Sequence, residues 1–283
     1  MKNYSQFNED LFLLDFFQKK NKKNNFFFEF GAWDGVYLSN CRLLSENDWS
    51  GCFVELEEAK FNELKKNYAD NPKILLLNEK IDYKTKNINS IIKINKINKI
   101  DVLSIDVDGN DLLIWKSLDI LQSNVVIIEF NNTIPFDTSY EDETNRSIGN
   151  SYLAIDNYAK SKEYELIKVT ACNLIYSKKD FNNNMIKPIT ANEVYNICKP
   201  IRVGFNNYGD YLFFSNHKLE YKEVFKNPGD KSFIQFQPIP KFLRNLTDIN
   251  GDGAKLLKKS YSLAIFLLLR PILFINYIFK KFK

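Results

Sequence analysis

Four acidic side chains each follow an apolar run in the first half of this 283-residue chain. Glu29 and Glu55 close the runs that start at residues 26 and 51. Asp106 and Glu129 close those that start at residues 101 and 124. A carboxylate at the end of a buried strand is costly unless a donor, a cation or a ligand compensates it. We therefore predict that these acids face a ligand.

A glycine loop follows Glu29 and leads into a helix. Gly31 and Gly35 are spaced G-x-x-x-G, which permits positive φ and a close approach of a ligand to the backbone. The fingerprint G-x-G-x-x-G is absent, so a nicotinamide oxidoreductase is disfavoured. Glu55 lies about twenty residues further on, where a carboxylate can accept both hydroxyls of a ribose. Together these features favour a nucleoside-containing cofactor.

A second acidic segment follows the run that starts at residue 101. Asp106, Asp108 and Asp111 repel one another unless a cation or donors neutralise them. Glu129 and Asn131 stand at the end of the next strand. Because hard oxygen ligands suit Mg²⁺, we predict a metal site of Asp106, Glu129 and Asn131. Capping of the following helix is the alternative for Asp108 and Asp111.

Strand and helix patterns alternate through residue 130. This alternation predicts an α/β fold with a doubly wound, mostly parallel sheet, and a site at the carboxyl ends of the strands. The expected helices are about 5–19, 39–46, 57–68, 88–97, 111–118 and 148–161. The expected strands are 26–30, 51–55, 73–77, 101–106 and 124–130, with 164–170, 173–176 and 211–214 to finish the sheet.

Several segments carry a family resemblance through their order and spacing. They are residues 5–10, 29–35 with Ser39 and Asn40, 49–55, 103–109, 126–129, and the run from 150 to 167. Over about residues 4–180 the chain resembles the S-adenosylmethionine-dependent methyltransferases of the FkbM type. It departs from the usual pattern at Glu29, where the family usually has Asp, and at Trp33, where it usually has Asn. Two further departures are Leu56 in place of Pro and Asp108 in place of Glu.

The resemblance implies a class I methyltransferase fold with a seven-stranded sheet, and methyl transfer from S-adenosylmethionine to a hydroxyl, often of a sugar. By position, Glu29, Gly31 and Gly35 would form the methionine side of the cofactor pocket, and Glu55 would hold the ribose. The cofactor-binding residues expected are Glu29, Gly31, Ala32, Trp33, Asp34, Gly35, Asn40, Glu55 and Asp106.

The reaction requires that the hydroxyl proton leave. His217 is the only histidine and lies far from these motifs, so a carboxylate or a Mg²⁺-bound hydroxyl is the better candidate. We predict Asp106 as the base or metal ligand, with Glu129 and Asn131 completing the site.

The net charge of +4 has an uneven distribution along the chain. Residues 255–283 hold seven Lys and Arg and no acid, which leaves a net charge of −3 on residues 1–254. Residues 261–279 are largely apolar, but Arg270 and Pro271 interrupt them, which favours a helix in the membrane interface over a transmembrane span. Packing of this tail on the body or on the second subunit of a homodimer is the alternative.

The expected organisation is a methyltransferase domain over 1–235, a linker over 236–254 and the basic tail over 255–283. The domain would contain a cofactor half at 26–130, and the rest of the sheet with an insertion at 147–216; residues 181–207 are the expected insertion or lid. Residues 248–253 begin like a calcium loop, but Lys259 replaces its bidentate Glu, so a turn is expected.

The predicted location is the cytoplasm, peripheral on the inner face of a membrane. Acids near the N-terminus leave no room for an export signal, and the four cysteines lack C-x-x-C spacing. The acidic body disfavours nucleic-acid binding. The predicted function is O-methylation of a sugar in a surface or lipid-linked glycan. The alternatives are a methyltransferase for a small metabolite, and a catalytically silent scaffold in a membrane-bound glycan assembly.

Overall fold

The computed structural model describes residues 2–85, 87–143 and 147–198, the backbone of 202–205, 211–214 and 233–236, and residues 260, 263, 264 and 267. The chain divides into two compact units, Met1–Pro200 and Ile201–Lys283. The domain boundaries after residues 235 and 254 stay predictions. Most of the tail, the calcium-like turn and His217 lie outside the described residues.

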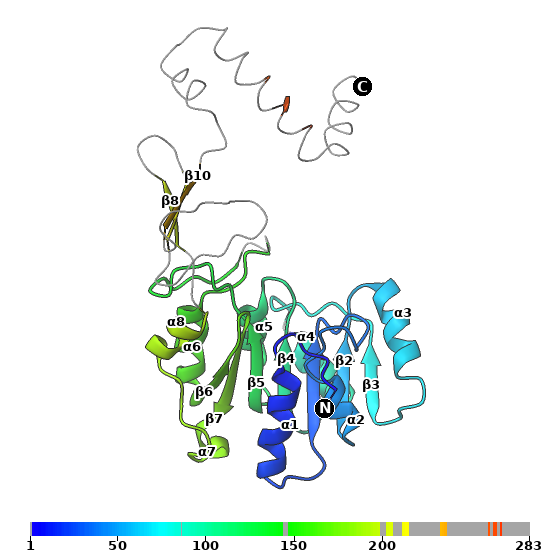
Figure 1. Cartoon of the computed structure of the whole chain (residues 1–283). Helices are drawn as coiled ribbons and strands as arrows, with labels where there is room; N and C mark the ends of the chain where they lie inside the picture. The colour runs from blue at the N-terminus through cyan, green and yellow to red at the C-terminus, as the bar shows by residue number, and fades with distance from the viewer. Residues whose placement is uncertain are drawn as a thin grey trace. The chain divides into compact units, whose positions relative to one another are not determined.

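A seven-stranded sheet forms the centre of the first unit, in the order β3-β2-β1-β4-β5-β7-β6 (Figure 1). Its strands are β1 (Phe26–Phe30), β2 (Ser50–Val54), β3 (Ile74–Leu77), β4 (Ile100–Ile105), β5 (Ser123–Glu129), β6 (Tyr164–Val169) and β7 (Asn173–Lys178). The strands β1 to β5 pair in parallel, whereas β7 pairs antiparallel with both β5 and β6. The predicted seven-stranded, mostly parallel sheet is thereby confirmed.

Helices cover both faces of this sheet (Figure 1). They are α1 (Glu9–Lys19), α2 (Arg42–Glu46), α3 (Glu58–Asn67), α4 (Asn87–Ile94), α5 (Asp111–Ser117), α6 (Tyr152–Ser161), α7 (Lys179–Asn182) and α8 (Ala191–Cys198). Side chains of successive strand residues point to opposite faces, so Phe27 joins the core under α1, α2 and α3, while Phe28 joins the core under α4, α5 and α6. Because both faces are buried, the strands are largely apolar, as the sequence shows.

Helix α1 is tied to the turn between β6 and β7 by a buried acid. The Glu9 carboxylate accepts hydrogen bonds from Thr170 Oγ1 at 2.9 Å and from Asn173 Nδ2 at 3.1 Å. Its other oxygen accepts the Phe7 backbone N–H at 2.7 Å. These bonds satisfy a carboxylate that is fully buried and join two parts of the chain that are far apart in sequence.

The second unit contains an antiparallel sheet in the order β10-β9-β8. Its strands are β8 (Arg202–Phe205), β9 (Tyr211–Phe214) and β10 (Phe233–Phe236). The prediction of a strand at 211–214 is confirmed, but its assignment to the main sheet is wrong, because β9 pairs with β8 and β10. The short connection from β8 to β9 favours a hairpin, and β6 and β7 already complete the main sheet.

Candidate functional site

Strand register brings the predicted site residues to one edge of the main sheet. Phe30 of β1 is in register with Val54 of β2 and with Ile105 of β4. The residue that follows each of them is Gly31, Glu55 or Asp106, so these three meet at the carboxyl ends of adjacent parallel strands. Ile105 is also in register with Ile128, which sets Asp106 beside Glu129. A site at this edge is what the predicted fold requires.

A cavity of about 600 Å³ opens at this edge. It is lined by seven of the residues predicted to bind a cofactor: Glu29, Gly31, Ala32, Trp33, Asn40, Glu55 and Asp106. Asp34 and Gly35 lie outside its lining. Its volume falls in the range of about 300–1,000 Å³ that is usual for small-molecule sites.

The Glu29 carboxylate holds the loop that forms one wall of this cavity. It accepts hydrogen bonds from Ser39 Oγ at 3.0 Å, from the Asn40 N–H at 3.2 Å and from the Cys41 N–H at 3.1 Å. Burial raises the pKa of Glu29 to about 7, although these hydrogen bonds oppose the shift. Asn40 in turn donates its side-chain amide to Ser104 Oγ at 3.1 Å, so the loop is fixed to β4 as well.

The two loop glycines have the same conformation and different surroundings. Gly31 has φ +69°, and a Cβ added there would lie 1.7 Å from the backbone oxygen of Asp106. Gly35 has φ +71°, but its Cβ would meet side-chain atoms of Leu64 and Tyr68 instead. Gly31 therefore permits contact between the ends of β1 and β4, whereas Gly35 permits the loop to pack under α3.

Asp34 stabilises the turn between these glycines and the segment that follows. Its Oδ1 accepts the Val36 N–H at 2.9 Å and the Tyr37 N–H at 2.7 Å. Its backbone oxygen accepts the side-chain amide of Asn67 at 2.8 Å. The structure thus gives Asp34 contacts within the protein that hold the loop against α3.

Glu55 is buried and lines the cavity with a carboxylate that is partly engaged. Its Oε2 accepts the Trp33 N–H at 2.8 Å, and its Oε1 accepts the Glu57 N–H at 2.7 Å. Each carboxylate oxygen can accept more than one hydrogen bond, so both keep capacity for a ligand. The backbone donors fix the orientation of the group.

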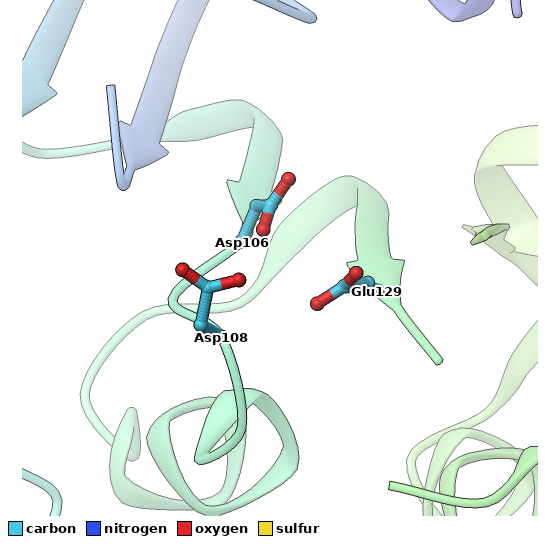
Figure 2. Close-up of side chains that lie close together, drawn as sticks. All are labelled: Asp106, Asp108 and Glu129. Carbon is cyan, nitrogen blue, oxygen red and sulfur yellow. The ribbon is translucent and has the colours of Figure 1, made fainter. Parts of the chain in front are cut away.

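Three carboxylates converge where β4 and β5 end (Figure 2). Carboxylate oxygens of Asp106, Asp108 and Glu129 lie within 4.8 Å of one another. Asp108 adopts φ +55°, and its side chain joins this group. Asp111 instead accepts the Val107 N–H at 2.9 Å and the Gly109 N–H at 3.0 Å. Asp111 therefore holds the turn that leads into α5, but these N–H groups precede the helix, so neither bond is a helix cap.

The environments of these acids separate their pKa values. Burial, followed by the charges of Asp108 and Glu9, raises the pKa of Asp106 to about 6. Burial, followed by the charges of Asp106 and Asp111, raises the pKa of Glu129 to about 8. Both groups therefore hold a proton more readily than an ordinary carboxyl group, and Glu129 does so more than Asp106. Such a pair can supply a proton acceptor and a proton donor at the same site.

A second cavity of about 310 Å³ lies beside the first. Glu129 and Asn131 line it, and Asp108 lines both cavities. The Asn131 side chain is engaged, because its Nδ2 donates to the Ile148 oxygen at 2.7 Å and its Oδ1 accepts the Thr133 hydroxyl at 2.6 Å. The structure thus brings Asp106 and Glu129 together, as predicted, and adds Asp108, whereas Asn131 shapes the wall of the second cavity.

Two contributions to the site are missed by sequence reasoning. Ser104 anchors Asn40 from the middle of an apolar strand, where a single serine is an inconspicuous signal. Asn150 donates its side-chain amide to the Gly109 oxygen at 2.7 Å and so fixes the loop that carries Asp108. Its place at the start of one of the resemblance segments is the only sequence signal for this contact.

Comparison with known proteins identifies the family resemblance in part of this unit. Residues 76–166 match the family model described as the methyltransferase FkbM domain. The matched segment contains Asp106 and Glu129 and ends before the sheet is complete, and it does not include Glu29 or Glu55. This match confirms the resemblance to FkbM-type methyltransferases. No curated protein matches the chain in sequence.

Solved methyltransferase structures are distantly similar. A S-adenosylmethionine-dependent methyltransferase from Clostridium acetobutylicum shows 12% identity and a TM-score of 0.43, covering 61% of this chain and 92% of that one. The N-terminal domain of EvdMO1 with SAH bound shows 11% identity and a TM-score of 0.41, covering 59% and 79%. Magnesium protoporphyrin IX methyltransferase from Synechocystis shows 12% identity and a TM-score of 0.41, covering 60% of this chain and 77% of that one.

Proposed function

We propose that this chain, which carries an FkbM methyltransferase domain, methylates a sugar hydroxyl of a surface or lipid-linked glycan with S-adenosylmethionine as the donor. The observation that carries the proposal is the convergence of the Asp106, Asp108 and Glu129 carboxylates within 4.8 Å of one another, at the point where two cavities adjoin. When bound, the cofactor supplies an electrophilic methyl group. The chain must then orient the hydroxyl and accept its proton.

The first cavity suits the cofactor. Glu55 presents a carboxylate, fixed by two backbone donors, that can accept the hydroxyls of a ribose. The Gly31–Ala32 backbone lines the same wall without a bulky side chain. Asp106 is also part of the lining. These residues support assignment of Glu29, Gly31, Ala32, Trp33, Asn40, Glu55 and Asp106 to the cofactor side.

Asp106 is the proposed base. With its pKa raised to about 6 it is basic enough to accept a proton from a hydroxyl as the methyl group is transferred. Glu129, which holds a proton more readily, can donate a hydrogen bond to an oxygen of the acceptor. Holding the hydroxyl in line with the methyl group supplies much of the rate, because orientation removes an entropic barrier.

The second cavity suits a hydroxyl-rich acceptor. Its lining includes Glu129, Asn132 and Ser147, whose polar side chains can form hydrogen bonds with hydroxyl groups. A small polar metabolite is the alternative acceptor. Screening both compound classes with labelled cofactor separates these two proposals, since only the true class yields a methylated product.

A catalytically silent scaffold is the competing proposal from another functional class. Titration calorimetry with S-adenosylmethionine and with its demethylated product tests it directly. Saturable binding of both supports the enzyme, and absence of binding favours the scaffold.

A divalent cation at the acidic group is the alternative to a base at Asp106, because a bound cation would keep all three carboxyl groups ionised. Asp106, Asp108 and Glu129 offer hard oxygen ligands within 4.8 Å of one another, and the Asn131 side chain would lose three hydrogen bonds if it turned to join them. Asp108 therefore replaces Asn131 as the third proposed ligand. Calorimetry with MgCl₂ on the protein and on Asp108→Asn tests this set, and an activity that survives chelation would remove Mg²⁺ from the proposal.

Association with a membrane through residues 255–283 is likewise a proposal. Within the described part of the chain, no helix has the length and apolar character needed to cross a bilayer. Flotation of full-length protein and of residues 1–254 with anionic liposomes tests the tail, and equal flotation of both would contradict its role. Contact of the tail with the body or with a second subunit is the alternative, which light scattering of the same two proteins addresses.

A further inference from the structure

We infer that the indole of Trp33 is a contact surface for the bound cofactor and covers it beside Glu55. This inference rests on the proposed function for the identity of the ligand. It goes further by giving one side chain, unusual at this position in the resemblance, a share of the cofactor affinity.

The backbone of Trp33 is held in an unfavourable conformation. Its φ is +51°, in the left-handed region, where a bulky side chain is a genuine outlier. The N–H of Trp33 donates to Glu55 Oε2 at 2.8 Å, which fixes the residue in this geometry. Asparagine or glycine would adopt the same backbone with less strain. We therefore expect the Trp33 side chain to make a favourable contact that offsets this strain.

The indole is not used in the core. Trp33 is 48% exposed, whereas Trp49 and Trp115, the other two tryptophans, are 5% and 4% exposed. Trp33 lines the first cavity. The Nζ of Lys60, on α3, lies 4.6 Å from the centre of its ring. This contact steadies the indole from the side of α3, and about half of the residue's surface stays exposed.

The surroundings of Trp33 fit a nucleoside. Three further exposed apolar side chains, Tyr37, Leu38 and Leu56, line the same cavity. Grouped apolar surface of this kind marks a binding site more often than it occurs by chance on a monomer. Glu55 supplies the polar contact for ribose hydroxyls, and Trp33 next to it supplies an aromatic surface for the apolar parts of the nucleoside. The cofactor would then cover surface that the free protein exposes.

This arrangement predicts opposite effects on folding and on binding. Replacing Trp33 by Asn removes backbone strain without removing a core contact, so the thermal unfolding midpoint should stay the same or rise. The affinity for the cofactor should fall by about tenfold, the size of effect expected when one well-packed aromatic contact is lost. Trp33→Phe, which keeps an aromatic ring, should retain most of the affinity.

The test combines calorimetry with tryptophan fluorescence, using S-adenosylhomocysteine as the probe. We expect wild-type protein to show a saturable change in emission on binding, and Trp33→Asn to bind about tenfold more weakly without that change. Binding of Trp33→Asn with wild-type affinity would overturn the inference while leaving the proposed function intact. An emission unchanged at saturation of the wild-type protein would do the same. Failure of the wild-type protein to bind the probe would overturn the proposed function, and this inference with it.

Discussion

Substitution of Gly31 by Ala should damage both stability and turnover. The added Cβ would lie 1.7 Å from the backbone oxygen of Asp106, and backbone atoms cannot rotate away as a side chain can. The ends of β1 and β4 must therefore separate by more than about 1 Å, and displacements of that size can cost about a hundredfold in rate. The left-handed φ of +69° adds about 1–2 kcal/mol for any residue with a Cβ.

Gly35→Ala is the matched control for this substitution. Its φ of +71° carries the same conformational cost, but its Cβ would meet side-chain atoms of Leu64 and Tyr68, which can shift. Gly35 also lies outside the cavity lining. We therefore expect both variants to lose about 1–2 kcal/mol from the left-handed backbone, with a further loss in Gly31→Ala from the separation of the strands.

Urea denaturation and a methyl-transfer assay with labelled cofactor measure the two effects separately. Gly31→Ala should lose about a hundredfold in kcat/KM, and Gly35→Ala much less. The reasoning would be refuted if Gly31→Ala kept wild-type turnover, or if both variants lost the same amount. Either result would mean that the contact between β1 and β4 does not control the position of Asp106.

Three further predictions follow from the acids of the site. Asp106→Ala should abolish turnover and leave cofactor affinity within about tenfold, measured by kinetics and calorimetry; activity of the variant would exclude Asp106 as the base. Glu55→Ala should weaken cofactor binding by more than about tenfold, because it removes the proposed ribose ligand and frees the Trp33 N–H; calorimetry checks this, and an unchanged Kd would contradict it. Burial raises the pKa values of Glu29 and Asp111 to about 7 in the folded protein, against ordinary values of 4.5 and 3.8. As pH rises, the unfolded chain therefore releases these protons before the folded protein does. The free energy of unfolding should then fall as pH rises from about 4 to about 7. Denaturation at several pH values tests this, with a smaller fall expected in Glu29→Gln; a rise over that range would show that other groups dominate.

The sheet was predictable because its signals are local and repeated. Apolar runs buried on both faces predict parallel strands, and helical spacing between them predicts crossovers. Which strand pairs with which is harder to predict, because pairing depends on residues distant in sequence. The segment 211–214 has the composition of a strand, but its pairing with β8 and β10 depends on residues elsewhere that compete for the same edge.

The site was predictable to the level of residue type and strand end. Register places Gly31, Glu55 and Asp106 together, and this follows from a parallel sheet once its strands are aligned. Sequence spacing does not show which acidic side chain points into the site; that depends on side-chain geometry. Asp108 and Asp111 are the same residue type three positions apart, yet one joins the group at the cavity and the other bonds to the turn before α5. The same limit applies to Asn131, whose amide is occupied by its neighbours.

The position of β7 sets the order in which this unit can be completed during synthesis. Strand β6 leaves the ribosome before β7 but lies at the outer edge of the sheet, so its place is vacant until β7 has paired with β5. Strand β6 pairs with β7 in this sheet, so it can join the sheet only together with or after β7. Glu9, which is made before either strand, acquires Thr170 and Asn173 as partners only at that stage. A nascent chain arrested before residue 173 should thus hold α1 only loosely, and protease sensitivity of its first twenty or so residues would report when the unit closes.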